Sequence, residues 1–330
     1  MSTRQVWDVL VCPKCKSKLS QVDSIVKDKQ ECIVCKSCGK RYPLVNSIID
    51  FESSLESELS TKDWSRQNFE KGYRELGDWD SIYDWDQKYG VPRNASSYKY
   101  ARVKGKILDM LKPQTGDSIL DLGCGNGYFI IQMFKKFSTT VKQLNYIGLD
   151  VSEHNVMNFL KKVEREKINN VDMFIGRAEM LPFKSDSIKW ITSSEALEHI
   201  EDKELALKEV YRILAPGGTF LFSTPSEQAI RNWNIILFPF RLGYRLLVRK
   251  NRQNRAFDQP ISRNKYMVIL NEIGFKNIKL NTSQLLSNEI ARYIPRFLLN
   301  MYISLTDIAE RNSSIMRRLF GLHIIGCARK

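Results

Sequence analysis

Short apolar runs recur along residues 96–330, and stretches with a helical period of apolar positions separate them. The runs predict strands at 119–122, 146–149, 173–176, 188–192, 219–223, 276–280 and 322–327. The amphipathic stretches predict helices at 98–111, 127–137, 156–167, 205–214 and 262–273. Strands that alternate with helices in this way predict an open α/β sheet.

Changes in composition divide the chain into three parts. Residues 1–51 hold most of the cysteines, residues 52–95 are rich in acidic, serine and aromatic residues, and residues 96–330 carry the strand and helix pattern. We expect a small metal-binding ribbon, a helical linker or lid, and a main domain, in this order. Two segments interrupt the main domain: a basic amphipathic insertion at 226–262 and an apolar and basic helical cover at 283–320.

The insertion contains a strongly basic segment. Residues 231–255 hold seven basic side chains and no acidic one. Arg241, Arg245 and Arg249 recur every four residues, so a helix would stack them on one face and leave apolar side chains elsewhere. Such a helix is typical of an anionic membrane interface. A lid packed on the domain and an RNA-binding arm are the alternatives.

The overall charge favours an anionic partner. The 330 residues include 51 Lys and Arg against 37 Asp and Glu, a net charge of +14. This balance favours nucleic acid or a membrane surface, and a soluble protein from a lysine-rich proteome is the plain alternative. Residues 1–10 contain Arg4, Asp8 and no apolar run, so no signal peptide is expected. No stretch reaches about 18 apolar residues, so we expect a cytoplasmic protein, with the inner face of the cell membrane as the alternative location.

Two Cys-x-x-Cys pairs near the N-terminus predict a metal site. They are Cys12 with Cys15 and Cys35 with Cys38, and 19 residues separate them. Four thiolates at this spacing suit one tetrahedral zinc ion that folds a small domain, because no open position remains for catalysis. Cys32 competes for a ligand position, but Gly39 eases the bend after Cys38 and favours the second pair. The segment resembles the short zinc-ribbon proteins that activate tRNA and protein methyltransferases, and a similar ribbon precedes some ribosomal RNA guanine methyltransferases.

The sequence Ile119-Leu-Asp-Leu-Gly-Cys-Gly-Asn-Gly-Tyr128 predicts the end of a strand and a tight turn into a helix. Its three glycines leave the backbone free to lie against a ligand. The dinucleotide fingerprint does not fit, because Tyr128 stands where the third glycine is required. The next strand ends at Asp150, whose carboxylate suits the two hydroxyls of a ribose. The turn and the acid together predict a nucleoside site, and S-adenosylmethionine is such a nucleoside.

Five ordered motifs resemble those of class I S-adenosylmethionine-dependent methyltransferases. They are Asp121-Leu-Gly-Cys-Gly-Asn-Gly127, Gly148-Leu-Asp150, Ala178-Glu-Met-Leu-Pro-Phe183, Glu195-Ala-Leu-Glu-His199 and Leu214-Ala-Pro-Gly-Gly218. The resemblance is close over residues 96–225 and strongest to the ubiquinone-pathway O-methyltransferases. It implies a doubly wound, seven-stranded, mostly parallel Rossmann-like α/β sheet with the cofactor at the carboxyl ends of its strands.

The resemblance also implies a set of cofactor-binding residues. These are Asp121, Gly123, Cys124, Gly125, Asp150, Val151, Ala178, Glu179, Ser194 and Arg102. Arg102 is expected at the methionine carboxylate of the cofactor, and a surface salt bridge is the alternative. Arg177 departs from the family, in which an acidic residue often stands at this position, so only the backbone contact with adenine is expected here.

Glu195, Glu198 and His199 are the candidate catalytic residues. Their spacing places them on one face of a helical turn, where two carboxylates and an imidazole suit a divalent ion such as Mg²⁺. The same pattern binds a divalent metal in the ubiquinone-pathway O-methyltransferases and in small-RNA 3′-end methyltransferases. His199 acting alone as a general base, and a turn that only caps a helix, are the alternatives.

These features predict an S-adenosylmethionine-dependent methyltransferase. The expected acceptor is an oxygen atom of an amphiphilic small molecule at the membrane surface, such as a quinone precursor, a lipid or a lipid-linked sugar. The alternative is a tRNA or rRNA methyltransferase whose ribbon and basic surface bind phosphates. A cofactor-binding scaffold whose ribbon docks a partner is a third hypothesis.

Overall fold

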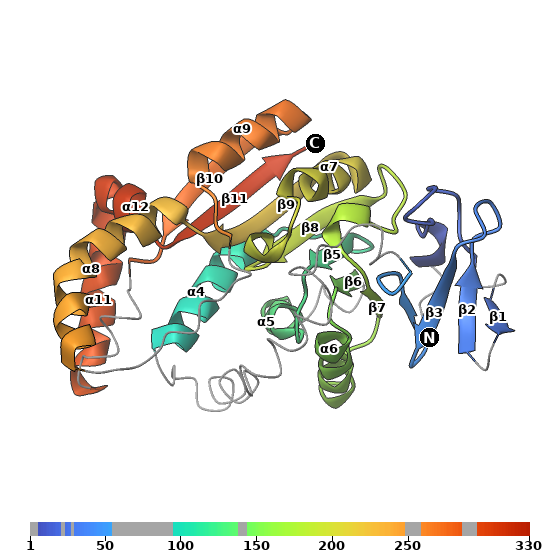
Figure 1. The fold of residues 1–330 in the computed structure, drawn as a ribbon, viewed down its shortest axis with the longest axis horizontal. Helices are drawn as coiled ribbons and strands as arrows, with labels where there is room; N and C mark the ends of the chain where they lie inside the picture. Colours follow the sequence, from blue (N-terminus) through green and yellow to red (C-terminus); the bar gives the residue numbers. More distant parts are fainter. Residues whose placement is uncertain are drawn as a thin grey trace.

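A computed structural model describes residues 6–20, 24–27, 30–54, 95–137, 144–247, 259–285 and 296–330. One sheet of eleven strands extends across the molecule in the order β1-β2-β3-β4-β7-β6-β5-β8-β9-β11-β10 (Figure 1). The strands are β1 Ser24–Lys27, β2 Gln30–Val34, β3 Arg41–Val45, β4 Ile48–Asp50, β5 Ser118–Leu122, β6 Asn145–Asp150, β7 Val171–Ile175, β8 Ile188–Ser194, β9 Leu214–Pro225, β10 Lys276–Ser283 and β11 His323–Arg329.

The seven strands from β5 to β11 confirm the predicted doubly wound sheet. Strands β7, β6, β5, β8 and β9 are parallel, and β11 lies antiparallel between β9 and β10. The strand order reverses between β5 and β8, because β6 and β7 lie on one side of β5 and β8 and β9 on the other. The crevice at such a reversal is where open α/β sheets bind ligands, at the carboxyl ends of the strands.

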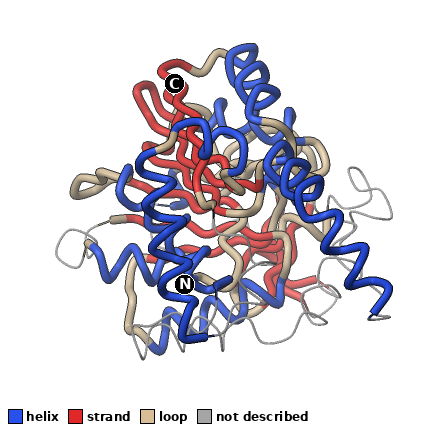
Figure 2. The backbone as a smooth tube through the Cα atoms, turned by 90° about the vertical axis from the view of Figure 1, so that its left-hand side faces the viewer, coloured by secondary structure: helices blue, strands red, loops and turns tan. Residues whose placement is uncertain are grey.

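Helices cover both faces of the sheet (Figures 1 and 2). They are α4 Ala95–Met110, α5 Tyr128–Lys136, α6 Glu153–Arg165, α7 Lys203–Ile213, α8 Glu227–Leu247, α9 Arg263–Ile273, α11 Arg296–Asn312 and α12 Ser314–Phe320, with short 3-10 helices η1 Val6–Asp8, η5 Ala178–Met180 and η6 Leu197–His199. One apolar core joins α7 and α9 to the sheet and reaches the ribbon. The other packs α4, α5 and α6 on the opposite face.

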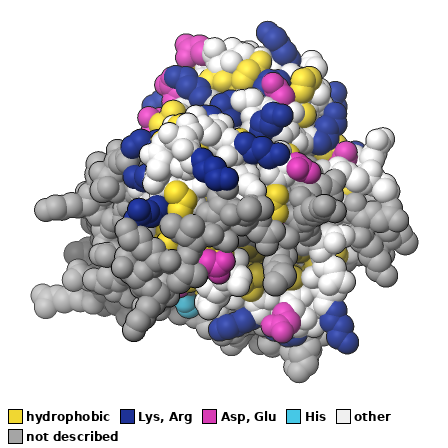
Figure 3. Space-filling view, turned by 90° about the vertical axis from the view of Figure 1, so that its right-hand side faces the viewer, with side chains coloured by type: hydrophobic (Ala, Val, Ile, Leu, Met, Phe, Trp, Pro, Cys, Tyr) yellow, Lys and Arg dark blue, Asp and Glu magenta, His cyan; other side chains and the backbone are white. Residues whose placement is uncertain are grey.

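The N-terminal ribbon continues the sheet of the main domain. Strands β3 and β4 form an antiparallel hairpin, and its turn places Asn46 and Ser47 at positive φ. Strand β4 then pairs in parallel with β7, with Ile49 opposite Phe174. The sequence did not reveal this continuity, because strand pairing between distant segments depends on the folded chain. The ribbon carries exposed Lys14, Lys18 and Lys36. Figure 3 faces this end, where Lys and Arg side chains spread over the upper part.

Helices α8, α11 and α12 gather at the end opposite the ribbon (Figure 1). Each is reached from the carboxyl edge of the sheet, because α8 follows β9 and α12 precedes β11. Residues 55–94 of the predicted linker at 52–95 and parts of the predicted insertion and cover lie outside the described residues, and so do the side chains of Arg241, Arg245 and Arg249. Within the described segments, no helix has the length and apolar character needed to cross a bilayer.

Candidate functional site

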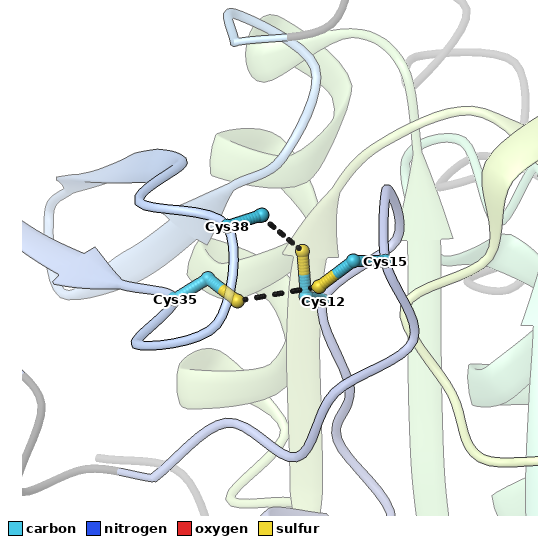
Figure 4. A group of neighbouring side chains, drawn as sticks. All are labelled: Cys12, Cys15, Cys35 and Cys38. Atoms are coloured by element: carbon cyan, nitrogen blue, oxygen red, sulfur yellow. Dashed lines mark hydrogen bonds between the residues drawn. The ribbon is translucent and has the colours of Figure 1, made fainter.

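The four predicted cysteine ligands converge at the base of the ribbon (Figure 4). All four sulfurs lie within 4.8 Å of one another. Cys12 Sγ is 3.6 Å from Cys38 Sγ, and Cys15 Sγ is 3.5 Å from Cys35 Sγ. Four sulfurs at about 2.3 Å from a tetrahedral zinc ion lie about 3.8 Å apart, so this donor set fits zinc. Cys32 lies in β2 opposite Pro43 and is not part of the cluster.

The environment gives three of these thiols, Cys12, Cys15 and Cys35, unequal pKa values. Hydrogen bonding with the Ser17 hydroxyl lowers the pKa of Cys15 to about 6. Burial raises the pKa of Cys35 to about 12. The Cys12 sulfur lies 3.0 Å from the hydroxyl of buried Tyr42, and burial raises its pKa as well. Because a metal binds thiolates, loading this site releases protons, and metal affinity should fall as the pH falls.

The glycine loop joins β5 to α5 as the sequence predicts. Gly123, Gly125 and Gly127 all have positive φ. A Cβ atom on Gly127 would lie 2.2 Å from the Phe159 ring, and one on Gly123 would lie 2.4 Å from the Cβ of Ala196. The loop therefore needs glycine at these two positions for space as well as for backbone conformation.

Asp150 ends β6 directly beside this loop. One carboxylate oxygen accepts a hydrogen bond from the Gly125 backbone N–H at 2.9 Å, and the other accepts one from the Ser152 N–H at 2.9 Å. Burial raises the pKa of the carboxyl group, and both backbone donors oppose that rise. The arrangement fixes an acceptor at the loop, next to Val151, where a ribose can bind.

Asp121 lies beneath the loop rather than on its surface. Its side chain is buried and accepts hydrogen bonds from the Tyr146 hydroxyl at 2.8 Å and the Thr192 hydroxyl at 2.9 Å. The neighbouring Cys124 thiol is buried too, and burial raises its pKa well above the usual value. These contacts give Asp121 a supporting position in the site.

Helix α4 presents a lysine to the site instead of the predicted arginine. Arg102 forms ion pairs with Asp307 and, at 3.4 Å, with Glu310, so the salt-bridge alternative describes its position. The ammonium of Lys104 lies 5.3 Å from the centre of the Tyr128 ring. Burial lowers the pKa of Lys104, and the nearby carboxylates of Asp121 and Glu195 oppose that change. The sequence did not single out Lys104, because the helical period alone does not tell which basic residue faces the loop.

The segment after β7 carries Ala178 and Glu179 on the short helix η5. Both side chains are buried, and burial raises the pKa of Glu179. Arg177, which precedes them, is buried against Glu52 from the ribbon. Its Nε donates to Glu52 Oε2 at 2.8 Å, and its Nη2 donates to Oε1. The sequence pointed to this position only through the basic residue Arg177, which stands where the family often has an acidic one; it did not identify Glu52 as the partner.

The predicted catalytic residues follow β8, but they do not share one helical face. Ser194 ends the strand with its hydroxyl 3.2 Å from that of Ser223. Glu195 lies before η6 with φ of 56°, and its backbone N–H donates to the Ser223 carbonyl. This left-handed turn directs its carboxylate to His323, with the ring nitrogen 2.8 Å away.

Glu198 and His199 lie together on the other side of that turn. Glu198 is buried and accepts a hydrogen bond from the Thr224 hydroxyl at 3.2 Å. His199 Nε2 lies 3.9 Å from Glu198, and its side chain is 30% exposed. In the described part of the chain, the cysteines are the one group whose ligand atoms lie close enough for a metal ion. The geometry therefore does not support the predicted Mg²⁺ site.

Two family models match the chain in separate segments. Residues 113–272 match a methyltransferase domain, and residues 4–47 match Trm112p-like proteins. Among solved structures, the complex between the Haloferax volcanii Trm112 methyltransferase activator and a methyltransferase is similar at a TM-score of 0.48 and 19% identity, over 75% of this chain and 96% of that one. Phosphoethanolamine N-methyltransferase 2 of Haemonchus contortus is similar at 0.49 and 18%, over 88% of this chain and 62% of that one.

Curated relatives match less than half of the chain. A demethylmenaquinone methyltransferase of Listeria welshimeri is 28% identical over 146 residues, which are 44% of this chain and 61% of the relative. The ubiquinone/menaquinone biosynthesis C-methyltransferase UbiE of Rickettsia typhi is 28% identical over 150 residues, which are 44% of this chain and 60% of the relative. The chain thus spans about three fifths of the length of these relatives.

Proposed function

Because this chain joins a class I S-adenosylmethionine-dependent methyltransferase domain at 113–272 to a Trm112-like zinc ribbon at 4–47, we propose that it methylates an amphiphilic small molecule. The observation that carries the proposal is Asp150, held by the backbone of Gly125 and Ser152 at the point where the strand order reverses. A fixed acceptor at a glycine turn suits the ribose of the cofactor, and no phosphate-binding fingerprint accompanies it.

In this reaction, the residues of the chain align the acceptor and remove its proton. When bound, S-adenosylmethionine supplies a methyl group on a sulfonium, which is already a good leaving group. The protein mainly aligns the acceptor with that methyl group. We assign to His199 the removal of the proton from an acceptor hydroxyl, because it is partly exposed and lies beside the Glu198 carboxylate. The Glu195–His323 pair holds the other side of this turn.

Lys104 is the residue that we assign to the methionine carboxylate of the cofactor. Among the described side chains of α4, the ammonium of Lys104 lies near Tyr128 at the loop, whereas acidic side chains of α11 hold Arg102. Replacing Lys104 by Met should weaken binding of S-adenosylhomocysteine about 10- to 100-fold, the value of one charge-assisted hydrogen bond. Binding of 5′-methylthioadenosine, which lacks the carboxylate, should stay unchanged.

Calorimetric titration of both ligands measures this difference. Arg102→Met is the competing variant, and it should lower thermal stability without a selective loss of S-adenosylhomocysteine binding. A selective loss in Arg102→Met that is absent in Lys104→Met would contradict the assignment.

An open, mostly apolar cavity on α8 supports an amphiphilic acceptor. Its volume is about 600 Å³, which falls within the range of small-molecule sites, about 300–1,000 Å³. Its lining residues are Glu227, Ile230, Arg231, Asn234, Ile235, Phe238 and Pro260. The cavity lies near the turn that carries Glu198 and His199, because its lining residue Pro260 follows Gln259, whose N–H donates to the carbonyl of Glu198 at 2.9 Å. An acceptor with its polar head group at His199 would therefore have its apolar chain along α8.

The outer surface of the same helices supports a membrane location. Among the described residues, every exposed large hydrophobic side chain except Leu205 and Val268 lies on α8, α11 or α12. Exposed Arg231, Arg311 and Arg318 lie on the same three helices. Apolar side chains with basic neighbours suit an anionic lipid interface, from which the site would take its acceptor.

The cavity leads to a prediction for acceptor binding. With S-adenosylhomocysteine bound, 4-alkylphenols of increasing chain length should bind more tightly by up to about fourfold for each buried methylene. Phe238→Ser should remove most of this dependence on chain length. Val268→Ser is the matched control, because Val268 is 53% exposed on α9 and does not line the cavity.

Methyl transfer tests the same acceptor class directly. With methyl-labelled S-adenosylmethionine, label should enter a lipid extract rather than total RNA. Mass spectrometry of the product would then show whether oxygen or carbon is methylated. Label in RNA alone would favour the RNA methyltransferase hypothesis, and the exposed ribbon lysines would then be the first residues to replace.

A further inference from the structure

The ribbon reaches the cofactor pocket through the edge of the sheet. Strand β4 lies parallel to β7, with Asp50 opposite Ile175. The pairing continues for one step, because the Phe51 N–H donates to the Ile175 carbonyl at 2.8 Å. Residues 51–52 therefore lie alongside residues 176–177, where the main chain turns toward η5. The ribbon ends at the carboxyl edge of the sheet, on the side of the pocket that carries Ala178 and Glu179.

A buried ion pair closes this contact. Glu52 is fully buried, and the side chain of Arg177 is 7% exposed. The guanidinium donates two parallel hydrogen bonds to the two carboxylate oxygens. A bidentate pair of this kind fixes the direction of the arginine side chain as well as its charge. Loss of Glu52 would remove the bidentate partner of a buried cation next to Ala178, which is unfavourable.

The ribbon also holds the far end of the same segment. The Val11 N–H donates to the Pro182 carbonyl at 2.9 Å, and the Lys184 N–H donates to the Val9 carbonyl at 2.8 Å. Residues 176–184, which we call the pocket segment, are thus bonded to the ribbon at both ends.

A third contact fixes the pocket segment through a shared carboxylate. The Lys16 ammonium lies 2.8 Å from Glu209 Oε2 on α7, and the same oxygen accepts a hydrogen bond from the Leu181 N–H at 2.9 Å. Lys16 follows the first pair of cysteines directly. Its position therefore depends on the knuckle that the metal would hold.

Aromatic contacts connect the cysteine cluster to the ion pair. The Tyr42 hydroxyl lies 3.0 Å from the Cys12 sulfur. The Tyr42 ring packs edge-on against Phe51 with 4.9 Å between ring centres, and Phe51 lies next to Glu52 in the chain. Displacement of the ribbon strands would therefore move the residue that holds Arg177.

We propose that the metal-loaded ribbon forms one wall of the cofactor pocket, in which Glu52 holds Arg177 as a positioning residue, so that cofactor affinity depends on metal occupancy. The inference rests on the proposed function, because it takes the ligand to be S-adenosylmethionine. Linkage requires the effect to be reciprocal, so the cofactor product should tighten zinc binding by the same factor.

The experiment is calorimetry of S-adenosylhomocysteine binding to the full chain, zinc-loaded and after removal of zinc by a chelator. The dissociation constant should rise about tenfold or more without zinc, within the usual range of coupling between two sites. In a competition with a zinc-binding dye, S-adenosylhomocysteine should raise zinc affinity by a similar factor. Equal affinity in both forms of the protein would overturn the inference.

Variants separate positioning from general stability. Glu52→Gln with zinc bound should weaken S-adenosylhomocysteine binding about tenfold, and the charge-swapped Glu52→Arg/Arg177→Glu variant should recover most of this loss. Leu19→Ala, a cavity in the ribbon core, should lower the unfolding temperature and leave affinity nearly unchanged at temperatures where it is folded. If Leu19→Ala lost as much affinity for S-adenosylhomocysteine as Glu52→Gln, the Glu52–Arg177 ion pair would only stabilise the fold and would not position the pocket.

The outcome for the zinc-loaded wild type distinguishes the two proposals. If the zinc-loaded protein does not bind S-adenosylhomocysteine, the proposed function fails. The inference about the ribbon then fails with it, because there is no cofactor affinity for the metal to change. If it binds, but zinc removal and Glu52→Gln both leave affinity unchanged, the methyltransferase proposal stands and the inference fails.

Discussion

Replacement of Asp150 by Asn should weaken binding of S-adenosylhomocysteine by about 100-fold or more. The carboxylate accepts two backbone hydrogen bonds, one from Gly125 and one from Ser152, on its two different oxygens. An amide would place an N–H₂ donor against one of these N–H donors, so the loop would lose a hydrogen bond. It would also lose the charge that accepts the ribose hydroxyls. Two charge-assisted hydrogen bonds at about 1.5 kcal/mol each account for the expected factor.

Calorimetry measures this effect, and Asp109→Asn is its control. Asp109 is exposed on α4 and pairs with Lys136 away from the loop.

The pH dependence of S-adenosylhomocysteine binding provides a second measurement. Burial raises the pKa of Asp150, so the folded protein takes up this proton at a less acidic pH than an ordinary aspartate. Affinity should therefore fall as the pH falls, beginning above the usual aspartate range. Unchanged affinity in Asp150→Asn would remove the basis of the nucleoside site.

Replacement of Cys35 by Ser should remove the bound metal and unfold the ribbon. Metal binding at four thiolates contributes about 10–16 kcal/mol to the folding of zinc-finger peptides, so one missing ligand is a large fraction of the ribbon's stability. We expect zinc content to fall from about one ion per chain to near zero. Strands β1 and β2 should also lose protection from hydrogen exchange, because their pairing partners all belong to the ribbon, whereas β4 also pairs with β7.

Cys32→Ser is the matched control for the metal site. Cys32 lies three positions before Cys35 and is buried in β2, but it is outside the cluster. Its replacement should leave zinc content unchanged in elemental analysis. If Cys32→Ser lost its zinc and Cys35→Ser retained it, Cys32 rather than Cys35 would be the zinc ligand. Because burial raises the pKa of Cys35 to about 12, retention of zinc by the wild type should weaken on acidification.

The sequence predicted those features that depend on neighbouring residues. Apolar periodicity gave the seven strands of the main domain, and the spacing of two Cys-x-x-Cys pairs gave the metal cluster. The glycine turn and the acid at the end of β6 were also predicted, because each follows a strand directly. These patterns are local, so they do not require knowledge of the packing.

The contacts that the sequence missed join residues far apart in the chain. Glu52 and Arg177 are 125 positions apart, and the pair forms only because β4 pairs with β7. Glu195 was expected to share a helical face with Glu198, but a left-handed turn directs it to His323 on β11. Lys104 and Arg102 both lie on α4, and only the position of α11 decides that Arg102 forms the salt bridges.

The pairing of β4 with β7 also affects how readily this chain can associate with other molecules through the edge of its sheet. Without β4, the backbone amides and carbonyls of β7 would form an open sheet edge, to which strands of other molecules could add. The ribbon therefore covers this edge of the main sheet and moves the open edge to the short strand β1. Because the ribbon and the main domain belong to one polypeptide, each main domain has its own covering strand in a fixed one-to-one ratio.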